Sequence, residues 1–350
     1  MQWPRPLDDL RSAARLARVG SAPILKAKMP MPPSAAPPDV LLVKSGGPAS
    51  LPEWRQAFAA LLPALRVHWW DDPAVPAEAV AYALVWEPVP GWLGHFPNLR
   101  IIFSSGAGVD HITSDPALPA DVPIVRMASG ETAQTVAEYV CLGALALLRD
   151  LPRMVAAQAA RRWDSFEAAR TAPDTRVGIL GMGNIGTLAA GMLRGLGFQV
   201  AGWARTERHV DGIPMMAGAA ALPAFLAGSD ILVALLPDTA ATRGLISART
   251  LAWLPRGAGL VNAGRGSLVV MADLIAALDS GQLGGAVLDV FEPEPLPPDS
   301  PAWRHPRILA TAHVAGFASR RARAGYVAGV IAGSLRGEAP AHLYQPARGY

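Results

Sequence analysis

Short apolar runs alternate with helix-compatible stretches along most of the chain, beginning at Asp39. The apolar runs at 40–43, 66–69, 82–85, 100–103 and 122–125 predict strands, and residues 50–65 predict a helix between the first two. Such alternation is typical of a parallel sheet that carries helices on its faces. The pattern therefore predicts a first α/β domain that closes near Met127.

A second alternating series follows a long predicted helix at 131–148, which is rich in Ala, Leu and Val. Its strands are predicted at 176–180, 198–203, 231–235, 259–261, 286–288 and 308–310. These six strands match the number in a Rossmann sheet. A last helix at 318–335 is expected to return to the first domain. We thus predict an α/β fold in which a Rossmann dinucleotide-binding domain, residues 131–316, is inserted in a flavodoxin-like substrate domain, residues 38–130 and 317–350.

Residues 1–37 differ from the rest of the chain, because a basic, partly amphipathic segment precedes a proline-rich stretch there. The segment lacks the continuous apolar core of a secretory signal. We predict a flexible N-terminal extension. An Arg-rich targeting segment and a start codon assigned too early are the alternatives.

Composition narrows the classes of partner. The longest apolar runs, such as 139–148, are shorter than the roughly 18 residues that a membrane span needs, so no membrane partner is expected. The net charge is only +3 and the basic residues are scattered, which argues against nucleic acid. A single cysteine, Cys141, excludes an internal disulfide and a cysteine metal cluster. We expect no metal and a reducing, cytoplasmic setting.

Three glycines with GxGxxG spacing, Gly181, Gly183 and Gly186, follow the strand at 176–180 and lead into a predicted helix at 184–196. In a dinucleotide site the first permits a tight turn, the second lets the backbone approach a pyrophosphate, and the third lets the helix pack on the strand. The free N–H groups of the helix start then face the phosphates. An ordinary tight turn is the alternative. The residues predicted to bind the dinucleotide at this turn are Gly181, Met182, Gly183, Asn184, Ile185 and Gly186.

Charged side chains follow successive strands of the second series. Arg265 comes after 259–261, Asp289 and Glu294 come after 286–288, and His313 comes after 308–310. In an open parallel sheet, ligands bind at the carboxyl ends of the strands. Each residue has an alternative when it is taken singly. Arg265 could form a surface ion pair, Glu294 could cap a loop, and His313 could be a structural histidine. Their joint placement predicts an active site.

Several motifs together resemble the D-isomer-specific 2-hydroxyacid dehydrogenase family, from about residue 39 to the C-terminus. They are the glycine motif and the sequences at 262–266 (NAGRG), 288–297 (LDVFEPEPLP) and 311–315 (TAHVA). The segments 83–86, 106–110, 138–139 and 347–350 are most similar to the bacterial glyoxylate/hydroxypyruvate reductase A branch. The resemblance implies reduction of a small 2-oxoacid, glyoxylate or hydroxypyruvate, and by analogy a homodimer. A dehydrogenase of a bulkier 2-hydroxyacid and a non-catalytic dinucleotide-sensing scaffold are the alternatives.

The resemblance also implies roles that agree with the charges of the reaction. Arg265 is expected to bind the substrate carboxylate and carbonyl with its planar fork of donors. The amides of Ala107 and Gly108 would hold the carboxylate from the other domain. His313 would donate a proton to the developing alkoxide. Glu294 would fix the tautomer of that imidazole and favour its protonated form.

Other positions have a weaker basis in the sequence. Trp86 is expected beside the substrate, and a core aromatic at a strand end is its alternative. Asp289 matches the family position that contacts the nicotinamide carboxamide, so we expect it to orient the cofactor. His95 and His111 receive no role and are interpreted as loop histidines.

The cofactor is predicted from the end of the second Rossmann strand. NAD-binding units usually have Asp or Glu there, accepting a hydrogen bond from the ribose 2′-OH. Here Arg205, Thr206 and Arg208 occupy that region, and they suit a 2′-phosphate, which predicts that NADPH is preferred and NADH possible. Solvated loop arginines are the alternative. The remaining predicted cofactor contacts are Trp203, Leu236, Pro237, Thr242, Ala263 and His313.

Overall fold

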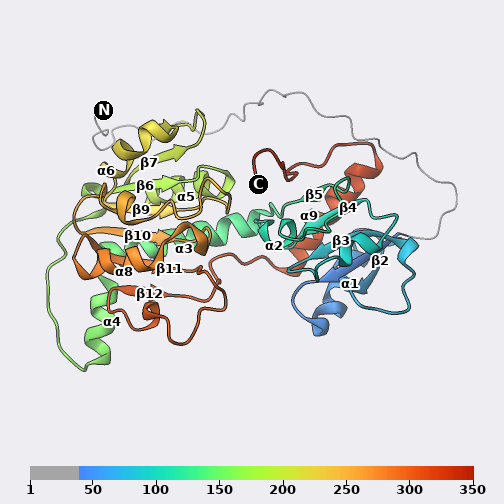
Figure 1. The fold of residues 1–350 in the computed structure, drawn as a ribbon, viewed down its shortest axis with the longest axis horizontal. Helices are drawn as coiled ribbons and strands as arrows, with labels where there is room; N and C mark the ends of the chain where they lie inside the picture. The colour runs from blue at the N-terminus through green and yellow to red at the C-terminus, as the bar shows by residue number, and fades with distance from the viewer. Residues whose placement is uncertain (1–38) are drawn as a thin grey trace.

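The computed structural model describes residues 39–350, so the extension predicted for residues 1–37 lies outside the described residues. The chain forms two lobes, each built around its own parallel sheet, and helix α3 (Gly130–Leu148) runs between them (Figure 1). Sequence order and spatial order differ, because the chain leaves the first lobe after β5 and returns to it only with α9. One lobe is therefore inserted in the other.

The first lobe contains a five-stranded sheet with the order β2-β1-β3-β4-β5, in which all neighbours are parallel. This order is that of flavodoxin-like folds, as predicted. Helices α1 and α9 pack on one face, and α2 packs on the other. The elements are β1 (Val40–Lys44), α1 (Leu51–Ala59), β2 (Arg66–Trp69), β3 (Val80–Val85), β4 (Ile101–Ser104), α2 (Asp110–Thr113), β5 (Ile124–Val125) and α9 (Arg320–Leu335).

The second lobe contains a seven-stranded parallel sheet with the order β12-β11-β10-β9-β6-β7-β8. It includes the Rossmann order and confirms the α/β class. The strands are β6 (Arg176–Leu180), β7 (Gln199–Ala204), β8 (Met215–Ala217), β9 (Ile231–Ala234), β10 (Ala258–Asn262), β11 (Leu283–Leu288) and β12 (Ile308–Ala310). Its helices are α4 (Leu151–Ala159), α5 (Asn184–Gly195), α6 (Leu222–Ala227), α7 (Ala248–Leu251) and α8 (Met271–Asp279).

Two sequence predictions about elements were wrong. The six-strand prediction missed β8, because this edge strand is only three residues long and half-buried throughout. The helix predicted over 50–65 is shorter, since α1 ends at Ala59 and the next residues turn back on Phe58. Pro63 lacks an N–H and disfavours helical geometry in the residue before it, so the helix cannot continue.

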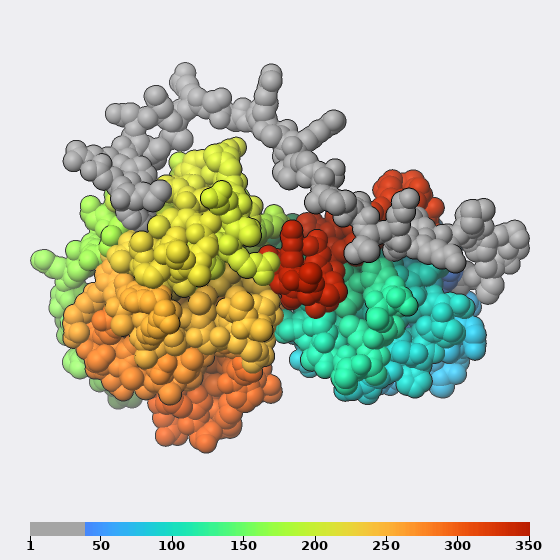
Figure 2. Space-filling view, turned by 45° about the horizontal axis from the view of Figure 1, so that its top comes forward, coloured from blue at the N-terminus to red at the C-terminus, as the bar shows by residue number. Residues whose placement is uncertain are grey.

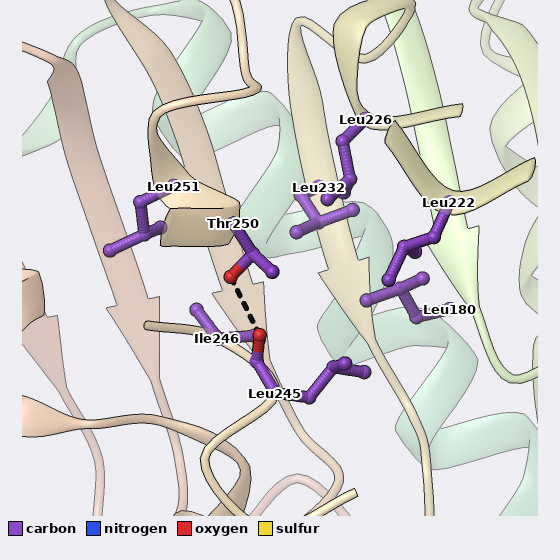
Figure 3. Close-up of a pocket in the computed structure, with 8 residues that line it drawn as sticks. All are labelled: Leu180, Leu222, Leu226, Leu232, Leu245, Ile246, Thr250 and Leu251. Carbon is purple, nitrogen blue, oxygen red and sulfur yellow. Dashed lines mark hydrogen bonds between the residues drawn. The ribbon is translucent and has the colours of Figure 1, made fainter. Parts of the chain in front are cut away.

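Helices cover both faces of the second sheet. On one face α3 and α5 pack against it, and on the other α6, α7 and α8 do. The core between the sheet and helices α6, α7 and α8 contains a small pocket of about 10 Å³, shown in Figure 3. Its lining is aliphatic except for Thr250, whose hydroxyl donates to the Leu245 carbonyl at 2.6 Å. With no free polar group, this pocket is a packing gap rather than a ligand site.

Helix α3 belongs mainly to the second lobe. Its buried face, which includes Val140 and Ala144, packs in the core beside α5, and Ser129 caps its start by accepting from the Thr132 N–H. Ala133 and Val136, near that start, line the space between the lobes. Within residues 39–350, no helix combines the length and apolarity needed to cross a bilayer.

Candidate active site

A cleft of about 1300 Å³ lies between the two lobes, with walls from both. The carboxyl ends of β6, β7, β9, β10, β11 and β12 open into it, as do the loops after β3 and β4. Every residue that the sequence assigned to substrate, cofactor or catalysis lines this cleft. Segments far apart in the sequence thus meet at one site, and the folding of the two sheets brings them together.

The glycine turn has the geometry that a bound pyrophosphate requires. Gly181 has φ +101°, and a Cβ on Gly186 would lie 2.1 Å from the Gly181 carbonyl oxygen, so both positions exclude a side chain. A Cβ on Gly183 would meet no atom within 4 Å, so this backbone faces open space. Gly183 is also the N-cap residue of α5, and it has no side chain that could cap the helix. The start of the helix therefore offers uncapped N–H groups to an anion.

No carboxylate ends β7. Ala204 is its last residue, and the cleft is lined next by Arg205, Thr206 and Arg208. Glu207 is exposed and is not among the residues lining the cleft. Positive side chains at this strand end suit a phosphate and do not supply the acceptor that a ribose 2′-OH needs.

Arg265 reaches from the end of β10 to the loop after β4 in the other lobe. Its Nε donates to Asp110 Oδ1 at 2.9 Å, and its Nη1 donates to the Gly264 carbonyl at 2.8 Å. Nη2 lies so close to the loop that a Cβ on Gly108 would stand 1.4 Å from it. The guanidinium is therefore held on two sides. Within residues 39–350, its remaining donors have no hydrogen-bond acceptor, which leaves them available to a ligand.

The loop that faces Arg265 is itself ordered by Ser104. The buried Ser104 hydroxyl donates to the Gly108 carbonyl at 2.7 Å and accepts from the Gly106 N–H at 3.2 Å. Among the described residues, the N–H groups of Ala107 and Gly108 have no hydrogen-bond acceptor. These free amides, opposite a guanidinium, make an environment that favours a carboxylate.

His313 and Glu294 form a hydrogen-bonded pair, with 2.7 Å between Nδ1 and Oε2. The other carboxylate oxygen of Glu294 accepts from the Phe291 N–H at 2.8 Å. The hydrogen bond to Glu294 raises the pKa of His313, and burial opposes it only in part. Burial alone would raise the pKa of Glu294, but the hydrogen bonds from His313 and the Phe291 N–H, together with the charges of His313 and Arg265, outweigh it and lower that pKa. The pair therefore favours an imidazolium whose Nε2 proton is available to the cleft.

Asp289 organises the loop that carries His313. Its Oδ1 accepts from the Thr311 hydroxyl at 2.6 Å and from the Val314 N–H at 2.8 Å, and its Oδ2 accepts from the Ala315 N–H. The backbone of His313, at φ +54°, also donates to the Asp289 carbonyl. This left-handed conformation is rare for a residue with a side chain, so the loop must hold it in place. Asp289 therefore positions the histidine.

Trp86 lies on the cleft wall between two histidines. Its ring is 6.0 Å from the His313 ring, edge to face, and 4.2 Å from the His111 ring. A Cβ on Gly106 would be 2.7 Å from it. Trp86 is thus half-buried in the wall of the cleft rather than part of a core.

Sequence reasoning missed several residues around the cleft. His111, interpreted as a loop histidine without a role, instead lies in helix α2 and is half-buried against Trp86, and burial lowers its pKa to about 4. Asp110 holds Arg265, yet no role was assigned to it. Tyr139, whose hydroxyl lies 2.7 Å from the Thr311 hydroxyl, extends the Asp289 network into α3, and burial raises its pKa to about 12. The sequence contained one usable signal, because Asp110 and His111 directly follow the glycine loop.

Comparison with known proteins agrees with this geometry. The profile of the D-isomer specific 2-hydroxyacid dehydrogenase NAD binding domain matches residues 142–315. The chain belongs to the D-isomer specific 2-hydroxyacid dehydrogenase family, which confirms the predicted family and its class, the NAD(P)-dependent oxidoreductases. Among its relatives, the glyoxylate/hydroxypyruvate reductase A of Serratia proteamaculans is 36% identical over 306 residues, covering 85% of this chain and 96% of that protein.

Solved structures show the same likeness. A D-isomer specific 2-hydroxyacid dehydrogenase from Xanthobacter autotrophicus, in complex with NADPH and MES, is 40% identical with a TM-score of 0.84, over 90% of this chain and 100% of that one. The NADPH-dependent glyoxylate/hydroxypyruvate reductase of Sinorhizobium meliloti, in complex with NADP and sulfate, is 37% identical with a TM-score of 0.82, over 89% and 100%.

Proposed function

We propose that this protein reduces a small 2-oxoacid, glyoxylate or hydroxypyruvate, to the 2-hydroxyacid with NADPH. The observation that carries the proposal is the meeting of Arg265 with the His313–Glu294 pair in one cleft, opposite free loop amides. A 2-oxoacid brings a carboxylate and an adjacent carbonyl, and these groups match a fork of donors and a proton donor. Two of the relatives described above are named glyoxylate/hydroxypyruvate reductases, and both of these substrates are small 2-oxoacids.

Arg265 and the loop after β4 bind the two ends of the oxoacid. The free donors of the guanidinium take the carbonyl oxygen and one carboxylate oxygen, and the amides of Ala107 and Gly108 take the carboxylate from the other lobe. Asp110 holds Nε, so the fork presents its far edge to the substrate. Trp86 limits the space left for the substrate side chain, which favours a small one.

His313 supplies the proton. When bound, the nicotinamide supplies a hydride to the carbonyl carbon, and negative charge develops on oxygen. The imidazolium of His313 donates its Nε2 proton to that oxygen, and Glu294 stabilises the charged ring beforehand. In the oxidative direction the neutral imidazole takes the proton back. Such general acid–base catalysis contributes roughly 100- to 10,000-fold.

The residues present fit a dinucleotide with a 2′-phosphate. The open backbone at Gly183 and the uncapped start of α5 suit the pyrophosphate. Arg205, Thr206 and Arg208 suit the 2′-phosphate, and Asp289, which also lines the cleft, is the proposed contact of the nicotinamide. The two solved relatives described above are in complex with NADPH and with NADP. Contacts from Met182, Asn184, Ile185, Trp203, Leu236, Pro237, Thr242 and Ala263 complete the proposed cofactor site.

Steady-state assays with NADPH and a panel of 2-oxoacids test the proposal. We expect turnover of glyoxylate and hydroxypyruvate, and faster turnover of a bulky acid such as phenylpyruvate would contradict the substrate size. NADPH binding without turnover of any oxoacid would favour the sensing scaffold instead. His313→Ala should abolish most of the rate and leave NADPH affinity nearly unchanged.

The division of the chain follows from its two sheets. We propose that residues 38–130 and 317–350 form the substrate domain and that residues 131–316 form the dinucleotide domain. Separate apolar cores on each sheet support the division. Limited proteolysis should cut first near these boundaries, and NADPH should slow the cuts.

We also propose a homodimer. Apolar side chains lie exposed on neighbouring helices, with Leu142 60% exposed on α3 and Val155 47% exposed on α4. Most soluble oligomers are closed and two-fold, so a second copy is the expected cover. Light scattering should give twice the mass of 36.7 kDa, and Leu142→Glu should lower it.

We propose a cytoplasmic location for the protein. Its single cysteine, Cys141, is a free, buried thiol. Cell fractionation with antibody detection tests the proposal, and recovery of the protein outside the cytoplasmic fraction would contradict it.

A further inference from the structure

The segment after α9 is anchored on the first lobe. Leu343 pairs with Val125 in an antiparallel bridge, and the Arg126 N–H donates to the His342 carbonyl at 3.1 Å. The Tyr344 N–H donates to the Ile124 carbonyl at 2.8 Å. These bonds place the segment along the free edge of β5, beside the cleft.

Residues 345–350 then turn away from that edge and reach the second lobe. The Gln345 N–H donates to the Tyr350 carbonyl at 3.1 Å and closes the turn. A Cβ on Gly349 would lie 3.0 Å from the Thr239 methyl group, in the loop after β9. Figure 2 shows this red segment lying between the two lobes. The segment therefore contacts both walls of the cleft.

The Tyr350 ring contacts an arginine from each lobe. The Arg205 guanidinium carbon lies 5.6 Å from the ring centroid, and so does that of Arg126. Both arginines and the tyrosine line the cleft. Arg205 is exposed, and within residues 39–350 its guanidinium makes no hydrogen bond or ion pair. The aromatic ring is therefore the contact that restrains it.

An aromatic partner restrains an arginine differently from a carboxylate. A carboxylate would neutralise the charge and occupy the N–H donors, whereas a ring face attracts the cation and leaves its donors free. Phosphate recognition needs that charge and those donors. The long side chain of Arg205 would otherwise lose rotamer entropy when it binds an anion. A ring that holds it in advance reduces this cost.

We propose that Tyr350 is a specificity-determining positioning residue, which holds Arg205 ready for the 2′-phosphate and links it to Arg126 of the first lobe. The inference rests on the proposed use of NADPH. The segment at 347–350 is part of the family resemblance, but the resemblance assigned no function to it. The inference gives this segment a role in cofactor choice. Because the segment is anchored beside β5, the 2′-phosphate site includes parts of both lobes.

Binding of two nucleotides that differ by one phosphate tests the role directly. Calorimetry with adenosine 2′,5′-bisphosphate and with AMP isolates the 2′-phosphate from hydride transfer. Tyr350→Leu should weaken the bisphosphate about 3- to 10-fold, as loss of a cation–π contact predicts, and should change AMP binding less than about 2-fold. Tyr350→Phe keeps the ring and should restore the wild-type ratio. In kinetics, the ratio of kcat/KM with NADPH to that with NADH should fall in parallel.

Tyr344→Leu is the matched control, because Tyr344 lies in the same segment but packs against the core of the first lobe. It should leave the nucleotide ratio unchanged. Equal weakening of both nucleotides by Tyr350→Leu would overturn the inference, since the ring would then serve the shared adenosine. An unchanged ratio would overturn it as well. If the wild-type protein itself binds the bisphosphate no better than AMP, the proposed NADPH preference fails instead.

Discussion

Arg265 donates its Nε–H to Asp110 Oδ1 at 2.9 Å, across the boundary between the two lobes and across 155 positions of sequence. Burial alone would raise the pKa of Asp110, but the charge and hydrogen bond of the Arg265 guanidinium, together with a backbone hydrogen bond and the nearby His111, outweigh it and lower that pKa. The carboxylate therefore stays charged and sets the direction of the fork. The residue proposed to bind substrate is thus oriented by the opposite lobe.

Asp110→Ala should lower kcat/KM for the 2-oxoacid about 10- to 100-fold, because a hydrogen bond between charged groups contributes roughly 1.5–3 kcal/mol. Most of the loss should fall on the KM of the oxoacid, and the KM of NADPH should stay the same. Steady-state kinetics measures both. Asp115→Asn is the control, since Asp115 follows the same short helix and caps backbone N–H groups of the first lobe. Equal losses in the two variants would contradict a positioning role.

Gly108→Ala should impair the reaction through sterics. Its Cβ would stand 1.4 Å from Arg265 Nη2, so the flexible guanidinium must move away from the loop. We expect at least about a 10-fold loss in kcat/KM with little change in thermal unfolding, since side-chain displacement needs no backbone shift. Gly130→Ala adds a methyl group with no atom within 4 Å and should behave as the wild type. A fully active Gly108→Ala enzyme would disprove the proposed contact with substrate.

Glu294→Gln should shift the pH profile of reduction. The hydrogen bond to Glu294 raises the pKa of His313, so the proton donor persists to higher pH in the wild type. Without the carboxylate that pKa falls, and the alkaline limb of the kcat profile should move to lower pH. The oxidative reaction, which needs neutral imidazole, should gain activity at lower pH. Glu292→Gln, at an exposed neighbouring carboxylate paired with Arg243, should leave both profiles in place. Profiles that do not move would remove Glu294 from the proton step.

Asp230→Asn should destabilise the second lobe in a pH-dependent way. Burial alone would raise the pKa of Asp230, but hydrogen bonds from Arg176 and Arg170 outweigh it and lower that pKa to about 2. Because the unfolded value is near 3.9, the charged form contributes about 2 kcal/mol to the free energy of unfolding above pH 4. That contribution is lost as the pH falls from about 4 to about 2.

Urea unfolding at pH 7 and at pH 3 measures the effect. The variant should be less stable than the wild type at pH 7, and the difference should shrink at pH 3. Asp211→Asn, at a carboxylate that is 98% exposed, should change neither value. A difference of the same size at both pH values would show that the ion pair is not its source.

The amino-acid sequence by itself determined the features that depend on neighbouring residues: the strands and helices, the glycine turn and the residues that follow each strand. Period and length of apolar runs predict strands and helices, because each element buries its own apolar face. The glycine spacing predicts the turn before α5, because a positive φ and a close approach exclude side chains at Gly181 and Gly186. The sequence also revealed charged and titratable residues directly after strands, such as Arg265 and His313. They could be grouped into one site because a parallel sheet brings the carboxyl ends of its strands to one edge.

Tertiary structure alone decided the contacts between distant segments. No local pattern pairs Asp110 with Arg265, stacks Trp86 on His111, or brings Tyr350 to Arg205, since these contacts depend on how two lobes pack. The short edge strand β8 likewise forms only because β7 offers it a partner. Sequence specifies which chemical groups the protein has and where each stands along its element, and the packing of the two sheets determines which of them meet.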